Sequence, residues 1–272
     1  MSILRKVRYT FSKTPVRAPL VWARHRGFQH SDAFVGSYPR SGSTWLRFML
    51  LEILAGRASG FSNTNEMIPD VGRHISATPV LPAGGRLVKT HEPFRAEYKK
   101  AIYLARDPRD VALSEFAYHK ALGLAGTDDF SVYLEEFLRG AVNPFGSWTN
   151  HAISWMDAAD SGRSEVLLVC FEELKRNSEQ ELRRIVEFLG VPVQAEKIRE
   201  AIANNSMDKM RQKEKADPQR ASAKGKFIRS GSAGGWREAF TEEQSQLVQQ
   251  YAGNILGRLG YAEVESLEGK LV

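Results

Sequence analysis

YPRSGSTWLR, residues Tyr38–Arg47, is the most informative segment of the sequence. It follows a short apolar run, Ala33–Ser37, and its second half opens an apolar run typical of a helix, Ser43–Ala55. A strand, a glycine-containing turn and a helix N-terminus bring free backbone N–H groups and the positive end of a helix dipole to one point. Arg40 adds a guanidinium that can hold a phosphate through two hydrogen bonds. The stretch therefore predicts a phosphate-binding loop.

The loop departs from the nucleoside-triphosphate pattern G-x-x-x-x-G-K-[ST]. Gly36 and Gly42 are one residue too far apart for it, and Ser43 stands where the lysine is required. No predicted strand ends in an evident Mg²⁺-binding aspartate. ATP or GTP hydrolysis is therefore disfavoured, and a kinase with a degenerate loop is kept as an alternative.

The apolar pattern around the loop predicts alternating strands and helices. Short apolar runs typical of buried parallel strands occupy Ala33–Ser37, Arg86–Lys89, Ala101–Ala105 and Glu165–Phe171. Helical periods with capping residues occupy Ser43–Ala55, Asp107–Leu122, Asp128–Arg139, Ser147–Ala159, Leu174–Leu189 and Thr241–Leu259. Two long loops are expected at Gly56–Gly85 and Lys213–Gly235. Alternating βα units imply an α/β domain with a mainly parallel sheet and helices on both faces, here over residues 32–265.

The positive charge of the chain is concentrated at its N-terminus. Residues 1–31 contain seven of the 38 lysines and arginines and no acidic residue, whereas the remainder carries 31 basic and 32 acidic residues. Leu4, Val7 and Phe11 are spaced to share a helical face, and Leu20–Trp22 adds a second apolar patch. Such a basic arm can pack on the domain, contact an anionic membrane peripherally or act as an organelle transit peptide. A nucleic-acid partner is not expected, because the rest of the chain is nearly neutral.

The single cysteine and the hydropathy restrict the cellular compartment and the kinds of site that the protein can have. Cys170 alone excludes an internal disulfide and a metal site made of cysteines, and it suits a reducing compartment. No apolar run is long enough to span a membrane as a helix. We therefore expect no bound metal and a cytoplasmic location, either free or at a membrane surface.

Two further motifs follow predicted strands, where ligands bind in open α/β folds. In LVKTHEPF, residues Leu87–Phe94, His91 is suited to take a proton from an alcohol near neutral pH. In IYLARDPRDVALSEFAYHK, residues Ile102–Lys120, Arg106 ends a strand and Ser114 lies about two helical turns later. Taken singly, a surface histidine and an ordinary strand–helix corner are the alternative interpretations.

A fourth motif, FIRSGSAGGWREAFT, covers Phe227–Thr241. Its glycines permit the backbone to approach a ligand closely. Arg229 supplies a cation for a phosphate, and the ring of Phe227 could lie on a base. A flexible glycine- and serine-rich loop without a ligand is the alternative.

Together, and in this order, the four motifs resemble those of the sulfotransferases that use 3′-phosphoadenosine 5′-phosphosulfate (PAPS). YPRSGSTW resembles the 5′-phosphosulfate loop Tyr-Pro-Lys-Ser-Gly-Thr-Thr-Trp of cytosolic members, and its Arg-Ser-Gly-Ser resembles the loop of carbohydrate sulfotransferases. Lys-Thr-His-x-Pro resembles the catalytic segment, and Tyr-Leu-x-Arg-x-x-x-Asp-Val-Ala-x-Ser resembles the 3′-phosphate site. The glycine-rich motif resembles Arg-Lys-Gly-x-x-Gly-Asp-Trp-Lys-x-x-Phe. The four segments span Tyr38–Thr241, about three quarters of the chain.

The resemblance implies a P-loop NTPase-like three-layer fold, PAPS as the sulfonyl donor and PAP as the product, without a metal. It makes His91 the general base and assigns Arg40 and Lys89 to the charge on the bridging oxygen. The residues implied for the 5′-phosphate, besides Arg40, are Ser41, Gly42, Ser43, Thr44 and Trp45. Those implied for the 3′-phosphate and its loop are Arg106, Ser114, Arg229, Ser230 and Gly231. Those implied for the adenine are Phe171, Ser206, Met207 and Phe227.

The sequence departs from the family pattern at some of these positions. Ser230 replaces a lysine, Phe171 replaces a tyrosine that hydrogen-bonds the adenine, and Met207 replaces a phenylalanine. The dimer motif Lys-x-x-x-Thr-Val-x-x-x-Glu of cytosolic members is missing from Arg237–Gln246, so no oligomeric state is predicted.

The acceptor is expected to be shaped by the loops Gly56–Gly85 and Ala121–Trp148. The Arg-Ser-Gly-Ser loop and the basic arm favour a hydroxyl of a carbohydrate or glycolipid, with phenols, amines and small alcohols left open. A non-catalytic nucleotide-binding protein is the alternative from another class, and His91 within Lys-Thr-His argues against it.

Overall fold

The computed structural model describes residues 11, 13–221, 228 and 231–261. Its sheet has four parallel strands in the order β2-β1-β3-β4, which confirms the predicted α/β fold with a parallel central sheet. The strands are β1 (Ala33–Ser37), β2 (Leu87–Thr90), β3 (Lys100–Ala105) and β4 (Glu165–Cys170). Each begins and ends within one residue of the predicted run.

Five predicted helices are present with closely similar bounds. They are α3 (Ser43–Ala55), α5 (Pro108–Leu122), α6 (Phe130–Leu138), α7 (Trp148–Ser161) and α14 (Glu242–Arg258). Asp107 caps α5 by accepting a hydrogen bond from the backbone N–H of Arg109, and proline follows the cap at the first helical position. The start of α5 is therefore determined locally, as its sequence indicates.

The prediction of one helix over Leu174–Leu189 was wrong. Two helices, α8 (Phe171–Arg176) and α9 (Ser178–Phe188), meet at Asn177, whose φ of −127° and ψ of 52° are not helical. Asparagine favours such positions because its side chain competes with helical backbone hydrogen bonding. The loop predicted over Gly56–Gly85 contains a short helix, α4 (Phe61–Met67), and the one predicted from Lys213 begins inside α11.

Several further elements were not predicted, because they are short or strongly polar. The helices are α2 (Ala18–Arg24), α10 (Ala195–Asn204), α11 (Met207–Ala216), α12 (Pro218–Ala221) and α13 (Trp236–Ala239). Two 3₁₀ turns are η1 (Pro15–Arg17) and η2 (Pro82–Gly84). None of the helices in the described ranges is long and apolar enough to cross a membrane. Leu4 and Val7 of the predicted basic arm lie outside those ranges.

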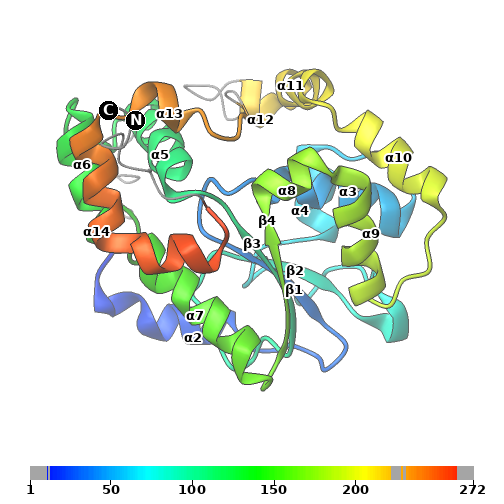
Figure 1. The fold of residues 1–272 in the computed structure, drawn as a ribbon. Helices are drawn as coiled ribbons and strands as arrows, with labels where there is room; N and C mark the ends of the chain where they lie inside the picture. Colours follow the sequence, from blue (N-terminus) through cyan, green and yellow to red (C-terminus); the bar gives the residue numbers. More distant parts are fainter. Residues whose placement is uncertain (1–10, 12, 222–227, 229–230, 262–272) are drawn as a thin grey trace.

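The sheet lies between two layers of helices. Figure 1 shows α3, α4, α8, α9 and α10 on one side of the strands and α5, α6, α7 and α14 on the other. Successive strand residues point to opposite faces, so Phe34 packs into the core beneath α7 and α14, whereas Val35 packs against α3 and α9. All five residues of β1 are buried, so the phosphate loop emerges from the most enclosed strand.

A buried ion pair joins the starts of the two neighbouring strands β1 and β2. Asp32 and Arg86 are 1% and 4% exposed, and the guanidinium donates to both carboxylate oxygens, Nε to Oδ1 at 2.9 Å and one terminal nitrogen to Oδ2 at 2.6 Å. Arg86 also donates to the carbonyls of Gly27 and His74. Burial alone would raise the pKa of Asp32, but the hydrogen bonds from Arg86 and from backbone N–H groups lower it below its usual value.

Replacing Asp32 should be strongly destabilising, because it leaves the Arg86 charge buried without a partner. We expect Asp32→Ala to lower the free energy of unfolding by about 3–5 kcal/mol in urea titrations. The control is Glu165→Ala, which removes an exposed ion pair with Lys100 and should change stability by less than about 1 kcal/mol. Equal effects of the two substitutions would contradict this account of the pair.

Candidate active site

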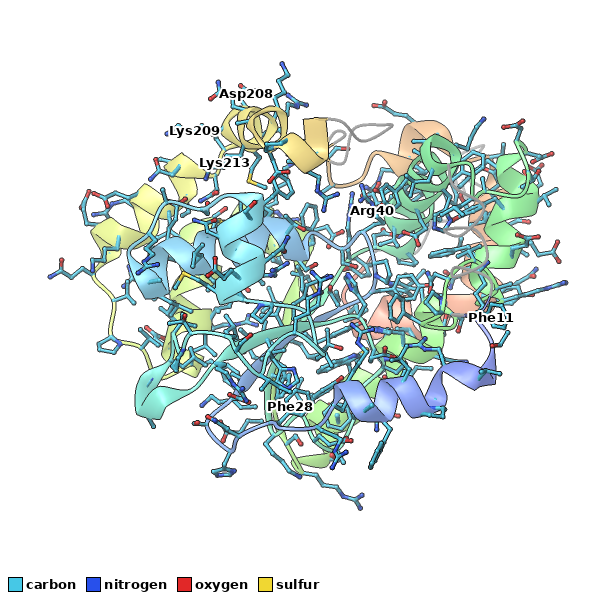
Figure 2. The ribbon with its side chains drawn as sticks, turned by 180° about the vertical axis from the view of Figure 1, so that it is seen from behind. Phe11, Phe28, Arg40, Asp208, Lys209 and Lys213 are labelled. Atoms are coloured by element: carbon cyan, nitrogen blue, oxygen red, sulfur yellow. The ribbon has the colours of Figure 1, made fainter. Side chains whose placement is uncertain are left out.

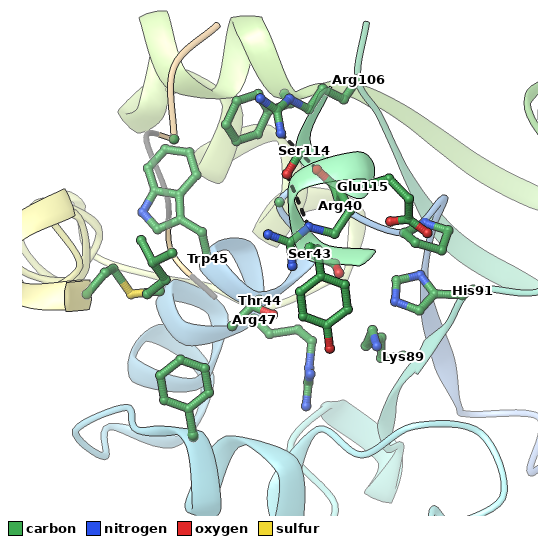
Figure 3. A pocket seen from close by; sticks show the side chains of 18 of the residues that line it. Arg40, Ser43, Thr44, Trp45, Arg47, Lys89, His91, Arg106, Ser114 and Glu115 are labelled. Atoms are coloured by element: carbon green, nitrogen blue, oxygen red, sulfur yellow. Dashed lines mark hydrogen bonds between the residues drawn. The ribbon is translucent and has the colours of Figure 1, made fainter. Parts of the chain in front are cut away.

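A cavity of about 780 Å³ lies at the carboxyl ends of the strands. Each strand delivers residues to it just beyond its last residue: Pro39 after β1, His91 after β2, Arg106 after β3 and Phe171 after β4. Figure 3 shows side chains from these separate segments converging on this one space. This is the position at which open α/β sheets bind ligands.

The phosphate loop has a backbone that suits an anion. Arg40 and Gly42 have positive φ angles of 66° and 93°, and a Cβ on Gly42 would lie 2.6 Å from the Phe171 ring, so the turn requires glycine there. The loop leads directly into α3 at Ser43, where the first N–H groups have no partner within the helix. The Ser41 hydroxyl oxygen is buried and has no hydrogen-bond partner among the described residues.

Arg106 joins the phosphate loop to the glycine-rich segment. Its two terminal nitrogens donate to the carbonyls of Arg40 at 2.8 Å and Ser232 at 2.9 Å, and its guanidinium lies 4.7 Å from the Phe171 ring centroid. Burial lowers the pKa of this arginine, and its Nε is buried without a hydrogen-bond partner among the described residues. Asp110 lies 3.9 Å from the Arg106 guanidinium as an ion-pair partner, and Arg106 still lines the cavity.

Asp110 is also what holds the glycine-rich segment in place. Its two carboxylate oxygens accept hydrogen bonds from the backbone N–H groups of Gly234 at 2.7 Å and Trp236 at 3.0 Å. Beside it, Arg109 is bound in a buried pair with Asp107 at 2.7 Å. Asp110 and Arg109 therefore both serve the local structure.

Arg40, in the loop after β1, contacts α5. Its Nε donates to the Ser114 hydroxyl at 3.1 Å, although the two residues are 74 positions apart. Its guanidinium lies 4.7 Å from the ring centroid of Tyr118. The first and third sequence motifs thus meet directly.

His91 has a defined tautomer. Its Nδ1 lies 2.6 Å from the carbonyl oxygen of Ser37, and a carbonyl can only accept, so Nδ1 carries the proton and donates. The lone pair is then on Nε2. Burial, and secondly the charge of Lys89, lower the pKa of His91 to about 3. The imidazole in the cavity is therefore neutral at physiological pH.

Lys89 is paired with an aspartate that sequence reasoning missed. Its ammonium lies 2.7 Å from the carboxylate of Asp70, and backbone hydrogen bonds at 2.8 Å from Lys89 to Pro69 and from Val71 to Lys89 hold the two segments together. Burial lowers the pKa of Lys89, and the Asp70 charge opposes that effect. Asp70 lies in the region predicted as a loop, where no local pattern marks it.

Most predicted site residues are brought together. Those that line the cavity are Arg40, Gly42, Ser43, Thr44, Trp45, Lys89, His91, Arg106, Ser114, Phe171, Ser206, Met207 and Gly231. Ser41 is fully buried and is not among the lining residues. Phe227, Arg229 and Ser230 lie outside the described residues. Trp45 is fixed by donating from Nε1 to the carbonyl of Asn205 at 2.8 Å.

Further lining residues were not predicted from the sequence. They are, among others, Arg47, Asp70, Glu115, His119 and Asn143. Glu115 and His119 are four residues apart on α5 and follow Ser114, so the helical spacing of that motif could have placed them beside it. Asn143 lies in a loop between helices, and only the tertiary structure brings it to the cavity.

Comparisons with known proteins agree with this geometry. Residues 30–260 match the model of the sulfotransferase domain. Mouse sulfotransferase 2B1 is 30% identical over 235 residues, covering 79% of this chain and 68% of the mouse protein. A mouse sulfotransferase crystallised with PAP has a TM-score of 0.69 at 25% identity, covering 90% of this chain and 94% of that one.

The same fold occurs in a retinol dehydratase solved with retinol and PAP. That structure has a TM-score of 0.69 at 22% identity, covering 88% of this chain and 86% of the other. The domain match extends over most of the described structure, including the phosphate loop, the Lys-Thr-His segment and Arg106. The chain belongs to the sulfotransferase family.

Proposed function

We propose that this sulfotransferase moves the sulfonyl group of PAPS to a hydroxyl group of a carbohydrate or glycolipid. The observation that carries the proposal is His91, a neutral imidazole whose Nδ1 is tied to the Ser37 carbonyl and whose Nε2 is left to accept a proton. It stands in the same cavity as three cationic side chains, Arg40, Lys89 and Arg106. A general base beside fixed cations suits transfer of an anionic group to an alcohol.

The residues present fit PAPS, which supplies an activated sulfonyl group on its 5′-phosphate. The N-terminus of α3, with the Ser43 and Thr44 hydroxyl groups, would hold the 5′-phosphate. Arg106, whose Nε has no partner among the described residues, and Ser114 would hold the 3′-phosphate. The aromatic and apolar side chains around the adenine would be Trp45, Phe171 and Met207, with Ser206 beside them. Phe227, Arg229 and Ser230 stay predictions.

In the proposed mechanism His91 Nε2 would accept the proton of the acceptor hydroxyl. The hydroxyl oxygen would bond to the sulfur of PAPS as the bond from sulfur to the 5′-phosphate oxygen breaks and PAP leaves. Lys89 and Arg40 stabilise the negative charge that develops on the bridging oxygen of the departing phosphate. Asp70 keeps Lys89 charged in spite of its burial. The Ser114 hydroxyl orients Arg40 through the hydrogen bond to Nε. Sulfonyl transfer is in-line, like phosphoryl transfer. His91 is assigned to the attacking oxygen, and Lys89 and Arg40 are assigned to the leaving oxygen.

The two alternatives from the sequence have less support. The family match argues against a kinase with a degenerate loop. A non-catalytic binding protein would need neither the defined tautomer of His91 nor the Lys89–Asp70 pair beside it.

We further propose that the described part of the basic N-terminal arm contacts a membrane surface. Phe11, Val16, Leu20 and Trp22 are 61–72% exposed, and no residue of α2 is buried. Figure 2 shows Phe11 at the edge of the molecule, near the start of α2. A basic segment with exposed apolar and tryptophan side chains suits an anionic interface.

The arm also lies close to the cavity. Arg17 forms an ion pair with Glu92, which directly follows His91, and its guanidinium lies 5.3 Å from the ring centroid of Phe145. Phe145 is itself a lining residue of the cavity. Membrane contact through this arm would therefore bring the cavity near the headgroups, where a glycolipid hydroxyl would be found.

Removing the proposed base should separate chemistry from cofactor binding. We expect His91→Ala to lower kcat by about 10²–10⁴-fold, the usual range for a general base, with the Kd for PAP within about two-fold of wild type because His91 is assigned no PAP contact. Calorimetry with PAP measures the Kd, and a sulfonyl-transfer assay with alkyl glycosides measures kcat. The control, Arg106→Ala, should weaken PAP binding. Undiminished turnover of His91→Ala would exclude this base.

The pH profile should report the electrostatic coupling of His91 and Lys89. Because the pKa of His91 is lowered to about 3, kcat/KM of the wild type should not fall through histidine protonation between pH 7 and pH 5. Lys89→Met removes a charge that lowers this pKa, so the acid limb should move to higher pH while kcat falls. The control is Lys100→Met, which changes the first residue of β3, at the end of that strand away from the cavity, and should leave the limb in place. If the acid limb of the kcat/KM profile does not move in Lys89→Met, the proposed electrostatic coupling between Lys89 and His91 is contradicted.

Membrane contact should depend on the exposed aromatic and aliphatic side chains. We expect wild-type protein to co-sediment with vesicles that contain phosphatidylglycerol and not with pure phosphatidylcholine vesicles. Leu20→Ser with Trp22→Ser should lower the membrane partition constant by about 10²-fold or more, given ~1.5–3 kcal/mol for each of the two large apolar side chains buried. The matched control is Ile75→Ser, which removes an equally exposed side chain from the loop before β2. Binding unaffected by the double substitution would exclude this surface.

A further inference from the structure

A buried carboxyl group on α5 has no role in the mechanism above. Glu115 is 3% exposed, follows Ser114 and lines the cavity. Its Oε1 accepts a hydrogen bond from Asn143 Nδ2 at 3.3 Å, whereas its Oε2 is buried with no hydrogen-bond partner among the described residues. Figure 3 shows the Glu115 carboxyl group on the same side of the cavity as His91 and Lys89.

The position of this carboxyl group is set by a chain of hydrogen bonds. Asn143 Nδ2 also donates to the Tyr38 hydroxyl at 2.8 Å, and that hydroxyl donates to the carbonyl of Gly146 at 2.9 Å. Tyr38 is the first residue of the phosphate loop motif and is fully buried. The carboxyl group is therefore fixed relative to the phosphate loop.

The neighbouring groups do not neutralise Glu115 as a simple ion pair would. His119 Nε2 lies 3.5 Å from Oε1, but burial, followed by the charges of Lys13 and Arg40, lowers the pKa of His119 to about 4, so it is neutral at pH 7. Burial raises the pKa of Glu115 to about 7, opposed mainly by Arg40. Ionised and protonated forms are thus both populated near neutral pH, and each can accept a hydrogen bond.

A buried oxygen without a partner is costly, at about 1–3 kcal/mol, and an apolar side chain of similar size would avoid that cost. Such an atom is retained in a folded protein where it stores strain, binds an ordered water or binds a ligand. The unpaired oxygen belongs to a residue that faces a cavity large enough for an acceptor, so a ligand that donates a hydrogen bond fits it. A cationic donor is disfavoured there, because Arg40 and Lys89 carry positive charge in the same cavity.

We propose that Glu115 accepts a hydrogen bond from a second hydroxyl group of the acceptor, so that the enzyme favours polyhydroxylated acceptors over those with a single hydroxyl. His91 takes the reacting hydroxyl, and Glu115 takes a neighbouring one and orients the acceptor. The inference rests on the proposed sulfonyl transfer and defines its acceptor class from this chain's own residues. Asn143 is the positioning residue that holds the carboxyl group.

The test compares two probes that share an alkyl chain. With PAP bound, the Kd of n-octyl β-D-glucoside and of 1-octanol is measured by calorimetry below their micelle concentrations, and KM and kcat are measured with PAPS. We expect wild-type protein to bind the glucoside about ten-fold more tightly than the alcohol, or better, since a site built to hydrogen-bond a hydroxyl rejects an analogue that lacks it.

Two variants at one position separate hydrogen bonding from shape. Glu115→Leu should raise the Kd and KM for the glucoside about ten-fold or more and leave those for 1-octanol within about two-fold, because only the glucoside loses a hydrogen bond. Glu115→Gln keeps an accepting oxygen and should retain the preference. The Kd for PAP should be unchanged in both variants, which also shows that they are folded.

The outcomes distinguish the two proposals. Wild-type protein that binds PAP but holds both probes equally overturns the role of Glu115. So does a Glu115→Leu variant that weakens PAP and both probes alike, because the carboxyl group would then be supporting Arg40. If wild-type protein does not bind PAP and does not transfer a sulfonyl group, that result instead overturns the proposed function itself.

Discussion

The structure of the site depends on the two hydrogen bonds of Arg106, which bring together segments that are far apart in the chain. One terminal nitrogen holds the Arg40 carbonyl and the other holds the Ser232 carbonyl. Because Arg40 has a left-handed backbone, the loop needs an external partner to offset that strain. The same contacts satisfy the two terminal nitrogens of Arg106, whose burial alone would be costly, and leave its Nε without a partner among the described residues. The hydrogen bonds of Arg106 thus both hold the phosphate loop in its conformation and place the Arg106 guanidinium in the cavity.

The charges of the site are arranged so that burial selects their protonation states. Burial lowers the pKa of both Arg106 and Lys89, and the neighbouring carboxylates, Asp110 at 3.9 Å and Asp70 at 2.7 Å, oppose that effect. His91 is kept neutral by burial and by the neighbouring ammonium. Fixed charges that are buried in this way act with less screening than charges in bulk water. The same physics makes a carboxyl group with an unpaired oxygen, as in Glu115, a binding feature rather than a neutral part of the core.

Local patterns in the sequence were sufficient to predict elements whose ends depend on neighbouring residues. The strands were predicted within one residue, and α5 begins where Asp107 and Pro108 indicate. The failure at Asn177 shows the limit: the apolar period continues across it, but a single residue leaves the helical region and splits the helix. The helix α4 was missed because seven residues carry too short a period to stand out from a loop.

The order of the motifs, the parallel α/β fold and the candidate set around Arg40, His91 and Arg106 follow from the sequence, because these features rest on residue type, spacing and strand ends. The proton on His91 Nδ1 and the pairing of Asp70 with Lys89 follow instead from the tertiary structure. It also decided that one buried oxygen of Glu115, a residue lining the cavity, is left unpaired among the described residues. These features depend on which distant atoms come within about 3 Å of each other, and no pattern of neighbouring residues encodes that distance.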